Sequence, residues 1–200
     1  MLKPEPRQAV RVEPSLPDYF RRRLSRYAAR LRPPPQEDTL WYLGEMMHRF
    51  SRSEHFFDYQ DGHLGNRPLA LLYGDAKAAS NPRQRCLLLQ RLGDMALFLG
   101  AFFPERYARR GIHRDYFVGM GSAAYDYLSE RARQHRHIFH ELTHGFVHMQ
   151  ELVAHAGSHG GGDPGERILR LYAHWLESGD PAVAAQLQRL GVILGGPQGH

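Results

Sequence analysis

Two histidines and a glutamate near residue 140 have the types and spacing of a metal-dependent catalytic site. His140, Glu141 and His144 belong to the run His-Glu-Leu-Thr-His. Positions i and i+4 of a helix lie on one face, so both imidazoles can reach the same Zn²⁺ ion. Glu141 would then stand beside the metal-bound water as general base. The pattern predicts a zinc-dependent enzyme as one alternative function.

The same five residues resemble the active-site helix of thermolysin-like metallopeptidases, which carry the zincin signature His-Glu-x-x-His. Those enzymes take a third ligand from a glutamate further along the chain, and the resemblance implies Glu166 in that role. They also bind substrate along the edge of a β-sheet, whereas this chain has no pattern typical of strands. The chain is rich in histidine, with 13 in 200 residues, which raises the number of chance matches. We therefore expect the match to be accidental.

A second metal site is suggested by two Glu-x-x-His pairs, Glu45–His48 and Glu141–His144. Two such pairs, together with carboxylates from two further helices, form the di-iron site of ferritin-like bundles. Asp94 lies in the most apolar segment and is the candidate for one of those carboxylates. The competing interpretation, which we favour, is that the histidines form a hydrated polar stripe and that Asp94 pairs with an arginine. We therefore predict no cofactor, with zinc or di-iron as alternatives.

The elements that would position these residues are all predicted to be helices. Apolar residues recur at helical spacing, and Pro82 after Asn81 is typical of a helix start. The segment that begins there is apolar on most faces, which predicts a central, buried helix. Gly119 and Gly121 are expected to allow close packing of helices. The predicted fold is an all-α single-domain bundle of seven or eight helices, over residues 16–32, 36–52, 67–79, 82–103, 114–133, 134–156, 164–178 and 181–192, with a turn-rich connection at 53–66.

Composition limits the class of protein. Hydrophobic residues make up 42% of the chain and charged residues 24%, which is typical of a globular domain. No apolar run approaches the roughly 18–20 residues of a membrane span. The single cysteine, Cys86, excludes an internal disulfide and fits a reducing, cytoplasmic environment. We expect a flexible lead-in over residues 1–15, one helical domain over 16–194 and a disordered tail over 195–200.

Positive charge is concentrated at the N-terminal end. Residues 1–35 hold nine Lys and Arg against three acids, a net charge of +6, whereas the whole chain has +5. Basic segments attract polyanions without sequence specificity. The candidate polyanion-binding residues are Arg21, Arg22, Arg23, Arg26 and Arg30. A solvated arginine-rich helix face is the interpretation we favour, and nucleic acid is not the expected partner.

A longer resemblance covers the middle of the chain. Residues 91–99 (RLGDMALFL), 102–106 (FFPER) and 115–125 (DYFVGMGSAAY) resemble the core of a family of bacterial all-helical proteins of about this length, which has no assigned activity. The resemblance extends from residue 40 to residue 194. That family keeps the Phe-x-Glu-Leu core at residues 139–142 without both histidines, which implies a structural role for Glu141.

Several polar residues lie within this apolar part of the chain, namely Asp94, Arg106, Arg110, Asp115 and Tyr116. A buried carboxylate requires a partner, and Arg106 or Arg110 is the predicted partner of Asp94. The group would form an ion pair that specifies the fold or, less favoured, the floor of a ligand pocket.

Taken together, these features favour a non-catalytic helper or regulatory protein that binds a protein partner or a second copy of itself. A metal-dependent enzyme that uses His140, Glu141 and His144 is the first alternative. Association with polyanions through the N-terminal arginines is the second.

Overall fold

The computed structural model confirms an all-α, single-domain helical bundle. It describes residues 16–51, 58–60, 63–65, 68–158, 171, 174–175 and 178–189. The helices are α1 (Leu16–Ala28), α2 (Glu37–Ser51), α3 (Leu69–Ala78), α4 (Pro82–Phe102), α5 (Pro104–Ala108), α6 (Arg114–Arg131), α7 (Arg136–His144), α8 (Phe146–Ser158) and α10 (Pro181–Arg189). The predicted lead-in, the tail, Glu166 and most of the helix expected over 164–178 lie outside the described residues.

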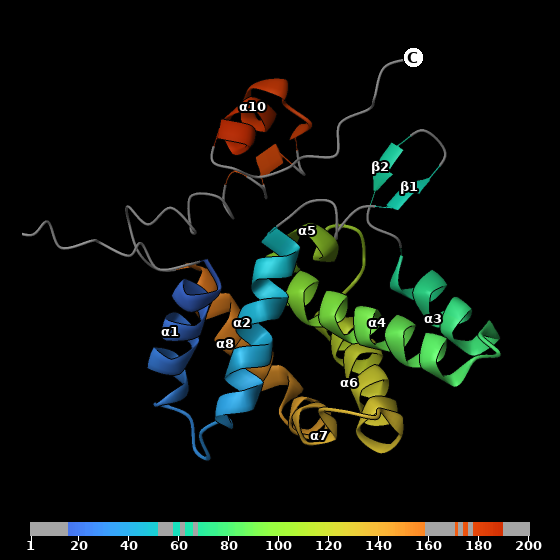
Figure 1. The fold of residues 1–200 in the computed structure, drawn as a ribbon. Coiled ribbons are helices and arrows are strands. Elements are labelled where there is room, and N and C mark those ends of the chain that lie inside the picture. Colours follow the sequence, from blue (N-terminus) through green and yellow to red (C-terminus); the bar gives the residue numbers. More distant parts are fainter. Residues whose placement is uncertain are drawn as a thin grey trace, which may run out of the picture.

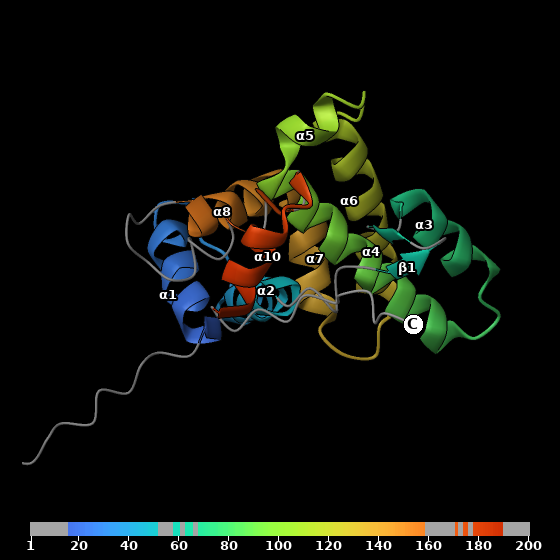
Figure 2. The same ribbon diagram turned by 90° about the horizontal axis from the view of Figure 1, so that it is seen from above.

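Helix α4 is the central element, as its apolar sequence predicts. The side chain of Asn81 accepts a hydrogen bond from the Arg83 backbone N–H at 2.8 Å, and Pro82 occupies the first turn. Every residue from Leu92 to Gly100 is buried. The helix contacts α3, α5, α6 and α8, and it runs through the middle of the bundle with α3 on one side and α1, α2 and α8 on the other (Figure 1, Figure 2).

Close packing of α6 against α4 and α8 depends on small residues. A Cβ atom on Gly93 would lie 2.6 Å from the ring of Tyr125, and one on Gly121 would lie 2.2 Å from the ring of Phe146. The expected packing role is therefore confirmed for Gly121. It is wrong for Gly119, which is exposed and has no atom of another described element within 4 Å of the Cβ position.

Two local features differ from the sequence-based prediction. The helix expected over 134–156 is broken at Gly145, which ends α7 with its N–H bonded to the Glu141 carbonyl oxygen at 2.9 Å. Helix α8 begins at the next residue, so the histidines lie on two helices. The connection at 53–66 contains a short antiparallel hairpin, β1 (Asp58–Gln60) and β2 (His63–Gly65), which the sequence did not indicate.

None of the described helices is long and apolar enough to cross a membrane.

Helix α6 offers a matched test of glycine packing. Gly121→Ala is expected to lower the free energy of unfolding by about 1–3 kcal/mol, because the added methyl group overlaps the buried ring of Phe146. Gly119→Ala, two residues away, is expected to raise it by about 0.5–1 kcal/mol, because alanine loses less backbone entropy in a helix. Urea unfolding of both variants measures the difference. Equal changes in the free energy of unfolding would contradict the close approach of α6 and α8 at Gly121.

Candidate functional site

The zincin-like run lies on α7, whose apolar side is fixed in the core. Ile138, Phe139 and Leu142 are buried, whereas His140 and His144 are exposed on the other side. The two imidazole rings stack with their centroids 4.2 Å apart and an interplanar angle of 29°. Sequence spacing therefore predicts correctly that the two histidines share one face.

Glu141 does not lie with these histidines as a general base. Its carboxylate accepts hydrogen bonds from the backbone N–H of Gln36 at 3.1 and 3.3 Å and from the hydroxyl of Thr39. These groups stand at the start of α2, where unpaired N–H groups and the helix dipole favour a negative charge. Glu141 therefore caps α2 from a neighbouring helix, and its carboxylate is engaged there rather than standing beside the two histidines. A structural role for this residue agrees with the family resemblance.

The alternative di-iron set is not assembled. Asp94 is enclosed in the core, the carboxylate of Glu141 is held at the start of α2, and His144 faces outward. Glu45 and His48 are half-buried on α2. Over the described part of the chain, no three His, Cys, Asp or Glu side chains are placed to hold one metal ion. Glu166, the third ligand implied for zinc, is outside that part.

The carboxylate of Asp94 is the centre of a buried polar cluster. Its Oδ1 atom accepts hydrogen bonds from the Tyr42 hydroxyl at 2.6 Å and the Tyr125 hydroxyl at 2.8 Å. Its Oδ2 atom lies 3.3 Å from Nη2 of Arg49, an ion pair that lies outside hydrogen-bond geometry. Nε2 of Gln90 donates to the Tyr42 hydroxyl at 3.1 Å. The cluster joins α2, α4 and α6 through side chains.

Burial dominates the protonation chemistry of this cluster. It raises the pKa of Asp94, and the positive charge of Arg49 and the two tyrosine hydroxyls offset that effect in part. Burial, and next the negative charge of Asp94, raise the pKa values of Tyr42 and Tyr125 well above the usual range. The tyrosines therefore keep their protons and act as hydrogen-bond donors. Because Asp94 and both tyrosines are buried, the arrangement is suited to holding helices together.

The partner of Asp94 in the structure is Arg49, which the sequence did not single out. The prediction of Arg110 as the partner is wrong, because Arg110 is exposed. Arg110, Asp115 and Tyr116 are exposed, because they follow the end of the central helix and begin α6 at the surface. The side chain of Arg106 is outside the described residues.

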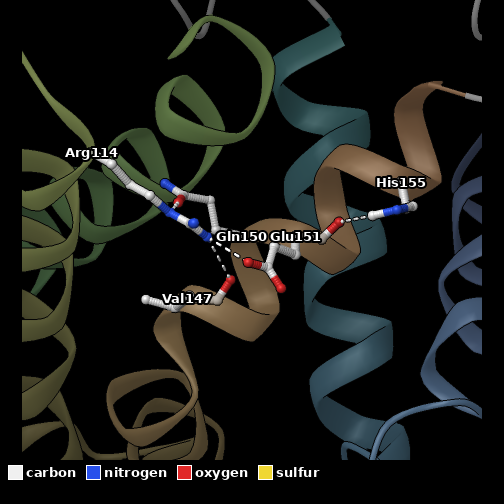
Figure 3. Close-up of polar contacts among 5 residues, drawn as sticks. All are labelled: Arg114, Val147, Gln150, Glu151 and His155. Carbon is white, nitrogen blue, oxygen red and sulfur yellow. Dashed lines mark hydrogen bonds and ion pairs between the residues drawn. The ribbon is translucent and has the colours of Figure 1, made fainter. Parts of the chain in front are cut away.

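A second polar contact joins α6 to α8 (Figure 3). Nε of Arg114 donates to Oε1 of Gln150 at 2.9 Å, and Nη2 lies 2.9 Å from Oε1 of Glu151 and 3.4 Å from the Val147 carbonyl oxygen. On the same helix, Nδ1 of His155 lies 2.7 Å from the Glu151 carbonyl oxygen. Gln150 is 2% exposed and is the buried end of this contact. No local sequence pattern indicates the contact between Arg114 and Gln150, since the two residues are 36 positions apart.

The five N-terminal arginines divide into two groups. Arg23 is only 8% exposed and donates to the Tyr19 hydroxyl at 2.7 Å and to the His155 carbonyl oxygen at 3.4 Å. It joins α1 to α8, and its assignment to a polyanion surface is wrong because its guanidinium is used inside the fold. Arg21 is exposed and pairs with Asp18 at 3.3 Å. The other three, Arg22, Arg26 and Arg30, are exposed.

Comparisons of the chain with protein-family models, curated proteins and solved structures found no match. The resemblance to a bacterial helical family therefore stays a prediction.

The role of Glu141 can be tested by stability. Glu141→Ala is expected to lower the free energy of unfolding by about 1 kcal/mol, because α2 loses the carboxylate that caps it. His140→Ala, the exposed neighbour, is the control and is expected to change it by less than about 0.5 kcal/mol. Urea unfolding measures both. An unchanged stability of the Glu141 variant would contradict the capping role.

The pKa of Asp94 predicts how stability depends on pH. Because the folded-state pKa is raised above the ordinary value of 3.8, the folded chain binds the proton more tightly than the unfolded chain. The contribution of Asp94 to the free energy of unfolding is therefore fully present below pH 3.8, and it is lost as the pH rises through the folded-state pKa. Compared with Asp94→Asn, the wild type is expected to lose stability as pH rises from about 4 towards neutral. Unfolding of both proteins across this pH range measures the difference. If the wild type instead gains stability relative to Asp94→Asn as pH rises, the charge of Arg49 lowers the pKa of Asp94 more than burial raises it.

Proposed function

We propose that this chain is a non-catalytic binding protein that contacts an acidic protein partner through exposed arginines of α1 and of the turn that follows it. We call this surface the basic face and define it as Arg22, Arg26 and Arg30. The observation that carries the proposal is that these three arginines are exposed at four-residue intervals, whereas Arg23 of the same helix is buried.

The basic face is held in a fixed position by the opposite side of α1. Phe20, Leu24 and Ala28 are buried in the core, and Arg23 ties the helix to α8. A rise of 1.5 Å per residue places Arg22 and Arg26 about 6 Å apart along the axis of α1, and Arg30 lies in the turn just beyond the end of the helix. An acidic helix with carboxylates at i and i+4 has the same spacing, so charges on the two helices can be paired in register.

The charge of this face is not neutralised within the described part of the chain. No hydrogen bond or ion pair of Arg22, Arg26 or Arg30 occurs there, although Arg30 lies over the ring of Tyr27 with its Cζ atom 5.6 Å from the centroid. That contact restricts the side chain and lowers the entropy lost on binding. Arginine is enriched at protein interfaces, which supports a binding role for such a surface.

The position of the aromatic residues favours a protein partner over nucleic acid. Binding of single-stranded nucleic acid uses exposed aromatic rings on which bases stack. In α1, Phe20 is buried, and Tyr19 and Tyr27 are half-buried against the core. A symmetric dimer across the basic face would place like charges opposite each other, which disfavours a second copy as the occupant of this surface.

The two carboxylates that suggested catalysis or metal binding are used in the fold, which supports a non-catalytic role. Glu141 caps α2, and Asp94 accepts two tyrosine hydroxyls in the core.

Binding to a defined acidic helical peptide, with glutamates at i and i+4, tests this function. Replacing Arg22, Arg26 and Arg30 together by Gln is expected to weaken binding about tenfold, since each exposed ion pair contributes roughly 0.2–1 kcal/mol. The salt dependence of the affinity is expected to become shallower as well. Fluorescence anisotropy across a range of NaCl concentrations measures both quantities.

The matched control removes the same charge elsewhere. Arg83, Arg110 and Arg133 are exposed and lie on other parts of the bundle, so replacing them by Gln is expected to leave the affinity within about twofold of the wild type. An equal loss in the two triple variants would reduce the effect to net charge and overturn the assignment of the face. If single-stranded RNA binds more tightly than the peptide does, the partner of the basic face is nucleic acid and not an acidic protein.

A further inference from the structure

The exposed histidines of α7 form a pair that is separate from the basic face. We propose that His140 and His144 together bind one late first-row divalent cation, with Cu²⁺ held most tightly, as a two-ligand site in which Glu141 takes no part. The rings are one helical turn apart, exposed, and stacked with centroids 4.2 Å apart. At this separation two imidazoles can contact one ion after small side-chain rotations.

Hydrogen bonding at His144 prepares one of the ligand atoms. Nδ1 of His144 lies 2.9 Å from the carbonyl oxygen of His140. A carbonyl oxygen can only accept, so Nδ1 carries a proton, and in the neutral ring the lone pair is then on Nε2. Donation of the second ring nitrogen to a backbone carbonyl is the usual arrangement for a metal-ligating histidine, since it fixes both the tautomer and the ring orientation.

The helix that carries the pair is fixed on its other sides. Ile138, Phe139 and Leu142 anchor α7 in the core, and the carboxylate of Glu141 is bonded to Gln36 and Thr39. The ligands are therefore presented on a rigid backbone, which reduces the entropy lost when the ion binds.

Neighbouring histidines have different surroundings. Nε2 of His137 lies 3.1 Å from Oδ2 of Asp38, so that ring is already engaged. His148 is exposed on α8, beyond the break at Gly145. Within the described residues no third side chain completes a metal site, so water would fill the remaining positions. Imidazole ligands with open positions suit Cu²⁺, which also leads the divalent series in affinity.

Calorimetric titration of the full, tag-free chain with Cu²⁺ in glycine buffer tests the site, because glycine competes with weak binding at isolated histidines. If both histidines bind the same ion, losing one of them should cost nearly as much affinity as losing both. His140→Ala and His144→Ala are each expected to weaken the affinity for the first, most tightly bound equivalent of Cu²⁺ about tenfold or more, because the second ligand of a chelate acts at high effective concentration. The double variant is expected to bind Cu²⁺ little more weakly than either single variant. His148→Ala is the control and is expected to bind as the wild type does.

Glu141→Gln separates this site from a zincin-like one. Affinity for Cu²⁺ is expected to stay within about twofold of the wild type, because Glu141 faces α2. Electron paramagnetic resonance is expected to show two imidazole nitrogens bound to copper in the wild type and in Glu141→Gln, and one in each single histidine variant. Circular dichroism checks that every variant is folded.

Three results would overturn the proposal. One is a loss of affinity in Glu141→Gln equal to that of the histidine variants, which would make Glu141 a ligand. Another is an unchanged affinity when either histidine is replaced. The third is an equal loss in His148→Ala, which would show adventitious binding by dispersed histidines. None of these results depends on whether the basic face binds an acidic partner.

Discussion

The carboxylate of Asp94 is the constraint on which the arrangement of the bundle depends. It is fully buried on the central helix and accepts the hydroxyls of Tyr42 from α2 and Tyr125 from α6. A buried carboxylate without such partners would cost several kcal/mol. The three helices must therefore meet at the spacing and rotation that bring both hydroxyls to the same oxygen atom. Gly93, the neighbouring residue on α4, makes this possible because a side chain there would overlap the ring of Tyr125.

The same principle operates at two other helix contacts. Glu141 on α7 satisfies the start of α2, and Arg114 on α6 reaches Gln150 and Glu151 on α8. In each case a polar side chain crosses from one helix to another, and α2, α6 and α8 are each fixed at a defined position. Polar contacts of this kind select one arrangement among those that an apolar core alone would tolerate.

This use of polar groups shapes the functional interpretation. The two carboxylates that resemble catalytic or metal-binding groups in the sequence, Glu141 and Asp94, are hydrogen-bonded within the fold, whereas the arginines of the basic face and the His140–His144 pair are exposed. Arg22 and Arg26 stand on α1 and the histidine pair stands on α7, and the opposite side of each helix is buried. A rigid helix that presents regularly spaced charges or ligands is suited to recognition, since little ordering is needed when a partner or an ion arrives.

The sequence by itself determined the helical class, the start of α4 at Asn81 and Pro82, and the burial of that helix, because these follow from local capping and from the spacing of apolar residues. It also determined that His140 and His144 share a face, since i and i+4 positions are fixed by helix geometry. Only the tertiary structure decided that Arg49 pairs with Asp94, that Glu141 turns towards α2, and that Arg23 is buried while Arg22 is exposed. These choices join residues distant in sequence, and they depend on how helices rotate about one another. Local patterns carry no information about that rotation.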